Sequence, residues 1–94
     1  MRRKGMIIQL RLGQVVATRG ILHVVPKCEL MAALERHKNC DWGEVPESDW
    51  AANDRALTRR ERIISAYRAD SQTKFWIITE ADRSATTLLL PEEY

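Results

Sequence analysis

The last third of the sequence alternates between apolar and polar side chains with a period of two, and this pattern limits the fold more than any other feature. The alternation runs through residues 62–68 and 74–79, and a third segment at 85–90 is rich in threonine and leucine. Side chains with this period point to opposite faces of a strand. Polar turn residues at 69–73 and 81–84 separate the segments, and a proline ends the last one. We therefore predict a three-stranded antiparallel meander.

The middle of the sequence has helical spacing instead. Within residues 27–39, the side chains that recur three and four residues apart are Leu30, Ala33, Leu34 and His37. These intervals place them on one face of an amphipathic helix. A second helix is predicted over residues 46–57, because Pro46 suits a helix start and two carboxylates follow in the first turn.

The amino-terminal part completes an α+β pattern. Residues 12–18 contain β-branched side chains between two glycines, which indicates a short strand. One or two helical turns fit residues 21–25, just before Pro26. The order β-α-α-β-β-β, with two to three helices, predicts an α+β domain in which the helices cover one face of the sheet.

The predicted middle strand is apolar on both of its faces. Phe75 and Ile77 share one face, and Trp76 and Ile78 share the other. Helices of one small domain cover a single face, so the second face needs the amino-terminal arm, long side chains or another copy of the chain. We therefore expect a monomer or a weak homodimer.

The composition describes one small domain. The chain has 94 residues, of which 45% are hydrophobic, and a formal net charge of +2. These values fit a single core and exclude a disordered class. We expect one domain over residues 1–94, with the basic residues 1–11 as a candidate flexible arm. Two cysteines, no signal-peptide pattern and no long apolar run favour the cytoplasm and exclude a membrane.

Charges are grouped along the chain. Residues 41–54 contain five acidic residues and no basic one, whereas residues 55–68 contain five arginines and one glutamate. Guanidinium groups bind phosphates, and aromatic rings stack on bases. The candidate nucleic-acid-binding residues are therefore Arg55, Arg59, Arg60, Arg62 and Tyr67. The alternative is that the two blocks neutralise each other within the fold.

Two other groups of residues are candidates for binding a protein partner. Trp42 and Trp50 stand in the acidic block, where they serve either as core anchors or as an interaction surface. Glu80, Asp82 and Arg83 stand in the predicted turn at residues 80–84, which is either ordinary turn structure or a binding site. A third alternative makes this turn the site of a small hydrolase.

Metal and thiol chemistry has weak support. The residues concerned are Cys28, His37, Cys40 and Asp41. Cys28 and His37 are nine residues apart on one predicted helix, so they point to opposite sides, and no closely spaced cysteine pair exists. No family signature surrounds either cysteine, and no glycine-rich phosphate loop is present. We therefore expect no metal and no cofactor, and we assign no catalytic residue.

Several short motifs resemble a known family. They are Asp41-Trp42-Gly43, the sequence ITEADRSATT at residues 78–87, and the sequence LPEEY at residues 90–94. Together they are similar to a family of small uncharacterised bacterial proteins of plasmids and integrated elements, over roughly residues 16–94. The resemblance implies an accessory protein of a mobile element, with an α+β fold and a cytoplasmic location. It implies no activity, and no functional residue is carried over.

The residues and the resemblance together favour a non-enzymatic protein that binds an unknown protein partner. The binding surface is expected at the Trp42 loop with the second helix, or at the turn of residues 80–84. Nucleic-acid binding through the arginines is the second interpretation.

Overall fold

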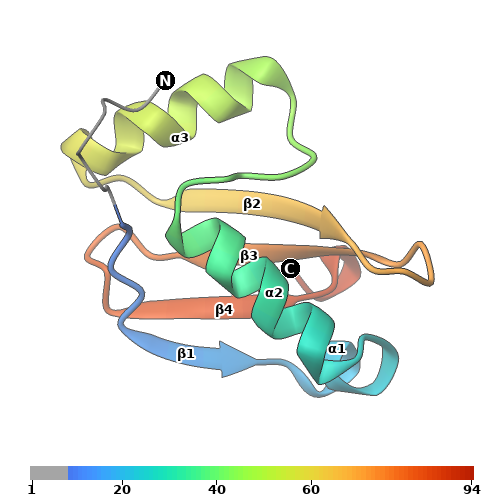
Figure 1. The fold of residues 1–94 in the computed structure, drawn as a ribbon. Helices are drawn as coiled ribbons and strands as arrows, with labels where there is room; N and C mark the ends of the chain where they lie inside the picture. The colour runs from blue at the N-terminus through green and yellow to red at the C-terminus, as the bar shows by residue number, and fades with distance from the viewer. Residues whose placement is uncertain (1–8) are drawn as a thin grey trace.

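The computed structural model describes residues 9–94, which form a four-stranded sheet, three α-helices and a short 3-10 helix (Figure 1). In chain order the elements are β1 (Gln14–Ala17), α1 (Arg19–Val24), α2 (Lys27–Lys38), α3 (Glu47–Arg59), β2 (Ile63–Arg68), β3 (Lys74–Thr79), β4 (Ala85–Leu89) and η1 (Pro91–Glu93). The predicted α+β class is confirmed. No helix in this part of the chain combines the length and the apolar character needed to span a membrane.

The sheet has the strand order β1-β4-β3-β2 and is mixed. The strands β2, β3 and β4 form the predicted antiparallel meander. The short strand β1 adds to it in parallel, with Gln14 opposite Ala85 and Ala17 opposite Leu88. The prediction of a short amino-terminal strand and a three-stranded meander thus differs in detail from the structure, in which all four strands form one mixed sheet. Local periodicity reports that a strand exists but not which strand it joins.

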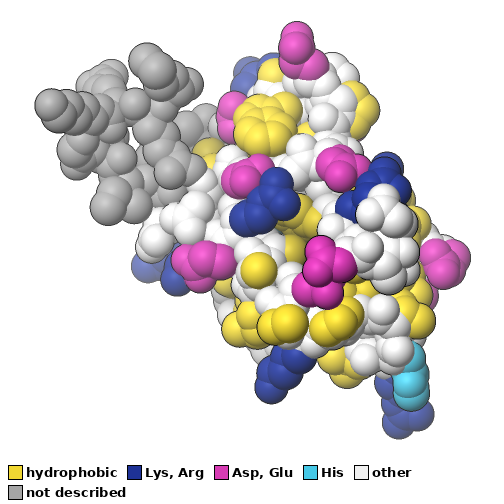
Figure 2. Space-filling model, turned by 45° about the vertical axis from the view of Figure 1, so that its right-hand side comes forward, with side chains coloured by type: hydrophobic (Ala, Val, Ile, Leu, Met, Phe, Trp, Pro, Cys, Tyr) yellow, Lys and Arg dark blue, Asp and Glu magenta, His cyan; other side chains and the backbone are white. Residues whose placement is uncertain are grey.

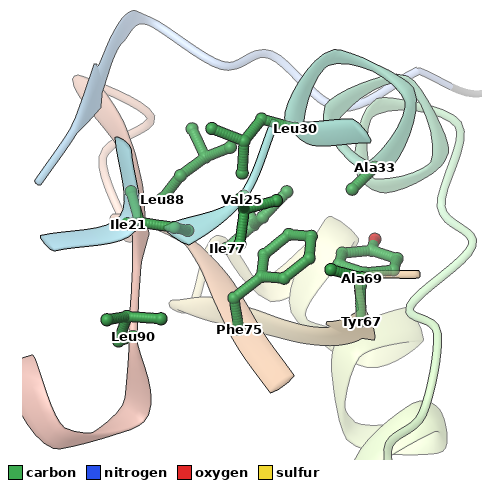
Figure 3. Close-up of a cluster of buried hydrophobic side chains, with 10 residues drawn as sticks. All are labelled: Ile21, Val25, Leu30, Ala33, Tyr67, Ala69, Phe75, Ile77, Leu88 and Leu90. Atoms are coloured by element: carbon green, nitrogen blue, oxygen red, sulfur yellow. The ribbon is translucent and has the colours of Figure 1, made fainter. Parts of the chain in front are cut away.

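The helices α1 and α2 cover one face of this sheet and close the main core (Figure 3). Ile21 of α1 and Leu30 of α2 point toward Phe75 and Ile77 of the middle strand, and these four side chains are almost fully buried. Burying a side chain of this size stabilises the fold by about 1.5–3 kcal/mol. The apolar face predicted for residues 27–39 therefore packs against the sheet, as expected for an amphipathic helix.

The third helix lies elsewhere, and this corrects the prediction that all helices cover one face. Figure 1 shows α3 along the outer edge of β2, beside the sheet and not over the face that α2 covers. The Asn53 side chain pairs with the backbone of Ile64: its Nδ2 donates to the Ile64 carbonyl over 2.9 Å, and its Oδ1 accepts from the Ile64 N–H over 3.4 Å. The amide of Asn53 thus takes the place of a neighbouring strand.

A loop closes the rest of this edge. The Ala66 N–H donates to the Trp42 carbonyl over 3.1 Å, and the Glu44 N–H donates to the Ala66 carbonyl over 2.7 Å. Gly43 between them has φ +75°, and an added Cβ would lie 2.0 Å from the Ala66 carbonyl oxygen. Glycine is therefore required where this loop approaches β2.

A second core cluster joins α3 to the rest of the molecule. It consists of Leu10, Trp42, Ala56 and Ile63. Leu10 is also held by its N–H, which donates to the Lys38 carbonyl over 2.8 Å. Residues 9–11 of the predicted arm are thus attached to the domain, and residues 1–8 lie outside the described part of the chain.

Candidate functional site

The second face of the sheet, opposite α2, carries a groove. Ile64 pairs with Ile78 and Ala66 pairs with Trp76 across β2 and β3, so these side chains share that face. Because α3 and the loop before it extend past the edge of β2, they form a wall beside it. The enclosed space has a volume of about 420 Å³. Its lining residues are Glu44, Val45, Pro46, Asp49, Ala52, Asn53, Arg62, Ile64, Ala66, Lys74, Trp76 and Tyr94.

Aromatic rings form the far side of the groove. The rings of Trp76 and Tyr94 meet edge to face, with centroids 5.6 Å apart and an interplanar angle of 70°. The Arg62 guanidinium lies over the Tyr94 ring, with its Cζ 5.1 Å from the centroid. Tyr94 remains 61% exposed, and Trp76 is half-buried. The groove therefore offers the indole ring of Trp76 and the phenol ring of Tyr94 to an incoming side chain.

Glu93 holds the chain end that supplies Tyr94. The Thr18 hydroxyl donates to Glu93 Oε1 over 2.6 Å, and the Leu90 N–H donates to the same oxygen over 2.8 Å. These hydrogen bonds lower the pKa of the Glu93 carboxyl. The carboxylate lies at the start of α1, where unpaired backbone N–H groups favour a negative charge. The LPEEY end of the sequence thus has a structural role beside its contribution to the groove.

Two charged side chains on the rims of the groove have no ion pair with any described residue. Asp49 is exposed in the first turn of α3, and Lys74 is exposed at the start of β3. Two other charges at the groove are paired: Glu44 with Arg68 at 3.0 Å, and Arg62 with Glu80 at 3.7 Å. Asp49 and Lys74 are therefore the charges that remain available to a ligand.

The two tryptophans proposed for protein binding have other places. Trp42 has no exposed surface, and its indole N–H donates to Asp54 over 2.9 Å. Trp50 is half-buried against the cluster around Trp42. Trp42 is therefore a core anchor, the favoured one of its two interpretations from the sequence, and does not face a partner in this fold. The loop after Trp42 and helix α3 still contribute to the groove, through residues 44–46 and 49–53.

The side chains of the turn at residues 80–84 are engaged within the protein. Asp82 Oδ1 accepts the Ser84 N–H over 3.0 Å, and hydrogen bonds from the Ser84 hydroxyl and backbone lower the pKa of Asp82. Arg83 donates to the carbonyls of Ala56 and Glu61 over 2.9 and 2.7 Å, at the end of α3. Together with the ion pair of Glu80, these contacts attach the turn between β3 and β4 to the end of α3.

The arginines divide into two sets. Arg68 forms an ion pair with Glu44 of the acidic block, as the alternative of mutual neutralisation predicts, whereas Arg62 pairs with Glu80, which lies outside that block. Arg55, Arg59 and Arg60 are exposed at the carboxyl end of α3 and form no ion pair with a described residue. The charge of Arg60 does act on Asp82, whose pKa it helps to lower.

Tyr67 is not available to stack on a base. The side chain is 2% exposed, and its hydroxyl donates to the Asp41 carbonyl over 2.7 Å. Burial raises the pKa of this phenol. The aromatic part of the predicted nucleic-acid surface is therefore absent at this position.

His37 belongs to a buried hydrogen-bond chain that the sequence pattern did not show. Its Nδ1 contacts the Ser65 hydroxyl, and its Nε2 contacts the Thr79 hydroxyl at 2.8 Å. Thr79 Oγ1 lies 2.7 Å from Thr86 Oγ1, and the Thr86 hydroxyl donates to the Leu12 carbonyl over 2.7 Å.

Proton counting along the chain assigns the histidine tautomer. Thr86 uses its single proton on Leu12, so Thr79 donates to Thr86 and must accept from His37 Nε2–H. His37 Nδ1 then accepts the proton of Ser65. Burial, with the charge of Arg83, lowers the pKa of His37 to about 3, so the ring is neutral.

The hydrogen-bond chain around His37 stabilises the core and does not form an accessible site. His37, Ser65, Thr79 and Thr86 have no exposed surface, and both ring nitrogens of His37 are engaged. Cys28 is exposed at the opposite end of α2, and the structure groups no three metal-binding side chains among residues 9–94. His37 therefore offers no nitrogen to zinc or to a thiol.

The chain matches no known protein-family model, and it has no significant match among curated proteins or among solved structures. The resemblance to small proteins of plasmids and integrated elements therefore stays a prediction.

Proposed function

We propose that the protein is a non-enzymatic binding module that receives a segment of another protein in the groove between α3 and the second sheet face. The observation that carries the proposal is the combination of apolar and charged groups at this place. Trp76 and Tyr94 offer aromatic surface, while Asp49 and Lys74 leave one negative and one positive charge on opposite rims. Aromatic residues beside desolvated apolar surface are typical of the energetic centre of protein interfaces.

The groove also defines the chemistry of its partner. The space of about 420 Å³ suits one or two large apolar side chains, packed against Trp76 and Tyr94. A basic group next to them would meet Asp49, and an acidic group would meet Lys74. Since charges at the rim orient a partner more than they hold it, the aromatic contact should dominate the affinity.

Selection from a random peptide library displayed on phage tests this proposal. We expect peptides with an aromatic or leucine centre, flanked by a basic and an acidic residue. Their affinity should fall about tenfold or more with Trp76→Ala and by a smaller factor with Asp49→Lys. Glu47→Lys is the matched control, because Glu47 is exposed on α3 outside the groove. Peptides that bind Trp76→Ala and Asp49→Lys as well as the wild type would refute the proposal.

The resemblance supports a setting for this activity. Together with the small number of cysteines, it favours an accessory protein of a bacterial mobile element that acts in the cytoplasm. A partner encoded on the same element would then be the natural ligand.

Nucleic-acid binding is a second candidate, favoured by Arg55, Arg59 and Arg60, which form no ion pair within the described part of the chain. Titration of labelled protein with a short DNA duplex should shift the NMR signals of these residues first. Three phosphate contacts predict a slope of about −2 to −3 in a plot of log affinity against log salt. Arg59→Glu should weaken binding, whereas Arg19→Glu, an exposed arginine on α1, should not. A spectrum that does not change at low salt would exclude this candidate.

A further inference from the structure

The outer edge of β1 is open as far as the described residues 9–94 are concerned. Gln14 donates its N–H to the Ser84 carbonyl over 3.0 Å, and Thr18 donates to the Leu88 carbonyl over 3.1 Å. In a parallel pair of strands, every second residue directs its backbone N–H and C=O groups toward the neighbouring strand. Val15 and Ala17 therefore direct their N–H and C=O groups away from β4, and no described residue pairs with them.

Residues 9–94 also give this edge none of the usual protection. Charged side chains, prolines and covering loops keep most exposed edge strands from pairing with another chain. The strand Gln14–Ala17 contains no charge and no proline. Val15 and Val16 point to opposite faces and are 43% and 42% exposed. At the other end of the sheet, Asn53 and the loop of residues 42–44 cover the edge of β2.

We propose that β1 pairs in antiparallel fashion with β1 of a second copy of this chain, around a two-fold axis at Val16. The two four-stranded sheets then form one continuous sheet. This inference goes beyond the proposed binding function, because β1 lies at the opposite edge of the sheet from the groove.

The strand is self-complementary in this register. Val15 of one copy exchanges its outward N–H and C=O with Ala17 of the other, and Val16 lies opposite Val16 of the second copy. Gln14 lies opposite Thr18, so polar groups also meet polar groups. Because the strand is uncharged, it offers no electrostatic preference for a charged partner, whereas an identical strand matches it residue by residue.

Apolar surface continues past the end of the strand. Helix α1 follows β1 directly, and its Leu22 and Val24 are 57% and 46% exposed. Figure 2 shows hydrophobic side chains gathered in the lower part of that view, with basic side chains along the lower rim.

Dimerisation at β1 leaves both grooves accessible. They would lie at the two outer ends of the joined sheet, one beside each β2. A dimer of this kind binds two segments at once and gains apparent affinity for a partner that carries two of them.

Sedimentation over a concentration series tests the dimer. The mass should rise from 10.9 kDa toward twice that value between about 10 µM and about 1 mM. Val16→Lys places two ammonium groups opposite each other at the axis, so it should raise the dissociation constant about tenfold or more. Met31→Lys, which changes an exposed residue of α2, should leave it unchanged. A wild-type mass that stays at the monomer value at about 1 mM would overturn the proposal.

Disulfide trapping tests the register. In a Cys28→Ser background, Val16→Cys brings two thiols to a non-hydrogen-bonded pair with Cα atoms about 4.5 Å apart, which a disulfide can span. Val15→Cys is the matched control: the residue is the same and equally exposed, but its copies lie more than about 7 Å apart in this register. Faster dimer formation by Val16→Cys supports the proposal, and equal or faster formation by Val15→Cys overturns it.

Discussion

The two edges of the sheet differ in whether their outward backbone groups form hydrogen bonds with the described residues. At β2, the Asn53 side chain and the loop of residues 42–44 occupy the outward backbone groups of Ile64 and Ala66. At β1, the outward groups of Val15 and Ala17 have no described partner. The covering of the β2 edge also forms the groove, because the loop and the helix that close this edge contribute the groove wall.

The buried chain around His37 connects these two edges. It begins at Ser65 of β2, passes through His37, Thr79 and Thr86, and ends at the carbonyl of Leu12 just before β1. Each strand of the meander therefore contributes one hydroxyl to it. Polar groups in a core fix relative positions only when all of them are satisfied, which is the case here.

The largest loss of stability is expected when the hydrogen-bond chain around His37 is broken. His37→Ala removes a buried ring and leaves Ser65 and Thr79 without their partner, which should lower the free energy of unfolding by about 3–5 kcal/mol. The exposed His23→Ala serves as the control and should stay within about 0.5 kcal/mol. Urea titration followed by circular dichroism measures both. Equal stability of the two variants would show that the chain does not hold the edges together.

Acid should weaken the same connection. The pKa of His37 is about 3 in the folded protein against 6.5 when unfolded, so the unfolded state binds the extra proton below pH 6.5. Stability is therefore complete above pH 6.5 and falls by about 1.4 kcal/mol per pH unit toward pH 3. Urea titrations between about pH 7 and pH 5 measure this slope. The same slope in a folded His37→Gln variant would contradict this assignment.

Uncovering the edge of β2 should lower the free energy of unfolding by a smaller amount. Asn53→Ala removes two hydrogen bonds to Ile64 at a residue that is 6% exposed, so we expect a loss of about 1–3 kcal/mol. Hydrogen exchange of the Ile64 amide should become faster. Ser48→Ala changes an exposed residue of the same helix and should do neither. Unchanged exchange at Ile64 would mean that Asn53 does not protect this edge.

A change at the open edge should have the smallest effect on stability. Val16→Lys at a concentration where the protein is monomeric should alter the free energy of unfolding by no more than about 0.5 kcal/mol, because the side chain is already 42% exposed. Thermal and urea unfolding at low concentration measure it. A loss as large as that of Asn53→Ala would show that β1 is covered within one molecule and would remove the contrast between the edges.

The candidate site was much less predictable than the secondary structure. The sequence indicated the second helix and the Trp42 loop as a binding region, and both do form one wall of the groove. It did not indicate Trp76 or Tyr94, because an indole in a strand and a tyrosine at a chain end carry no local sign of proximity. Tyr67 was predicted at the surface and is buried, and Trp42 takes the core role, which was one of its two interpretations, since an aromatic side chain has the same sequence pattern in either place.

The sequence by itself determined the meander, the amphipathic helix of residues 27–38 and the α+β class, because periods of two and of three to four residues are properties of neighbouring side chains. Only the tertiary structure decided that β1 joins β4 in parallel, that α3 lies at the edge of β2, and that His37 meets two hydroxyls from two strands, those of Ser65 and Thr79. These features bring together residues that are tens of positions apart. Their free energy depends on which backbone and polar groups remain unpaired after the sheet has formed, and no local pattern contains that information.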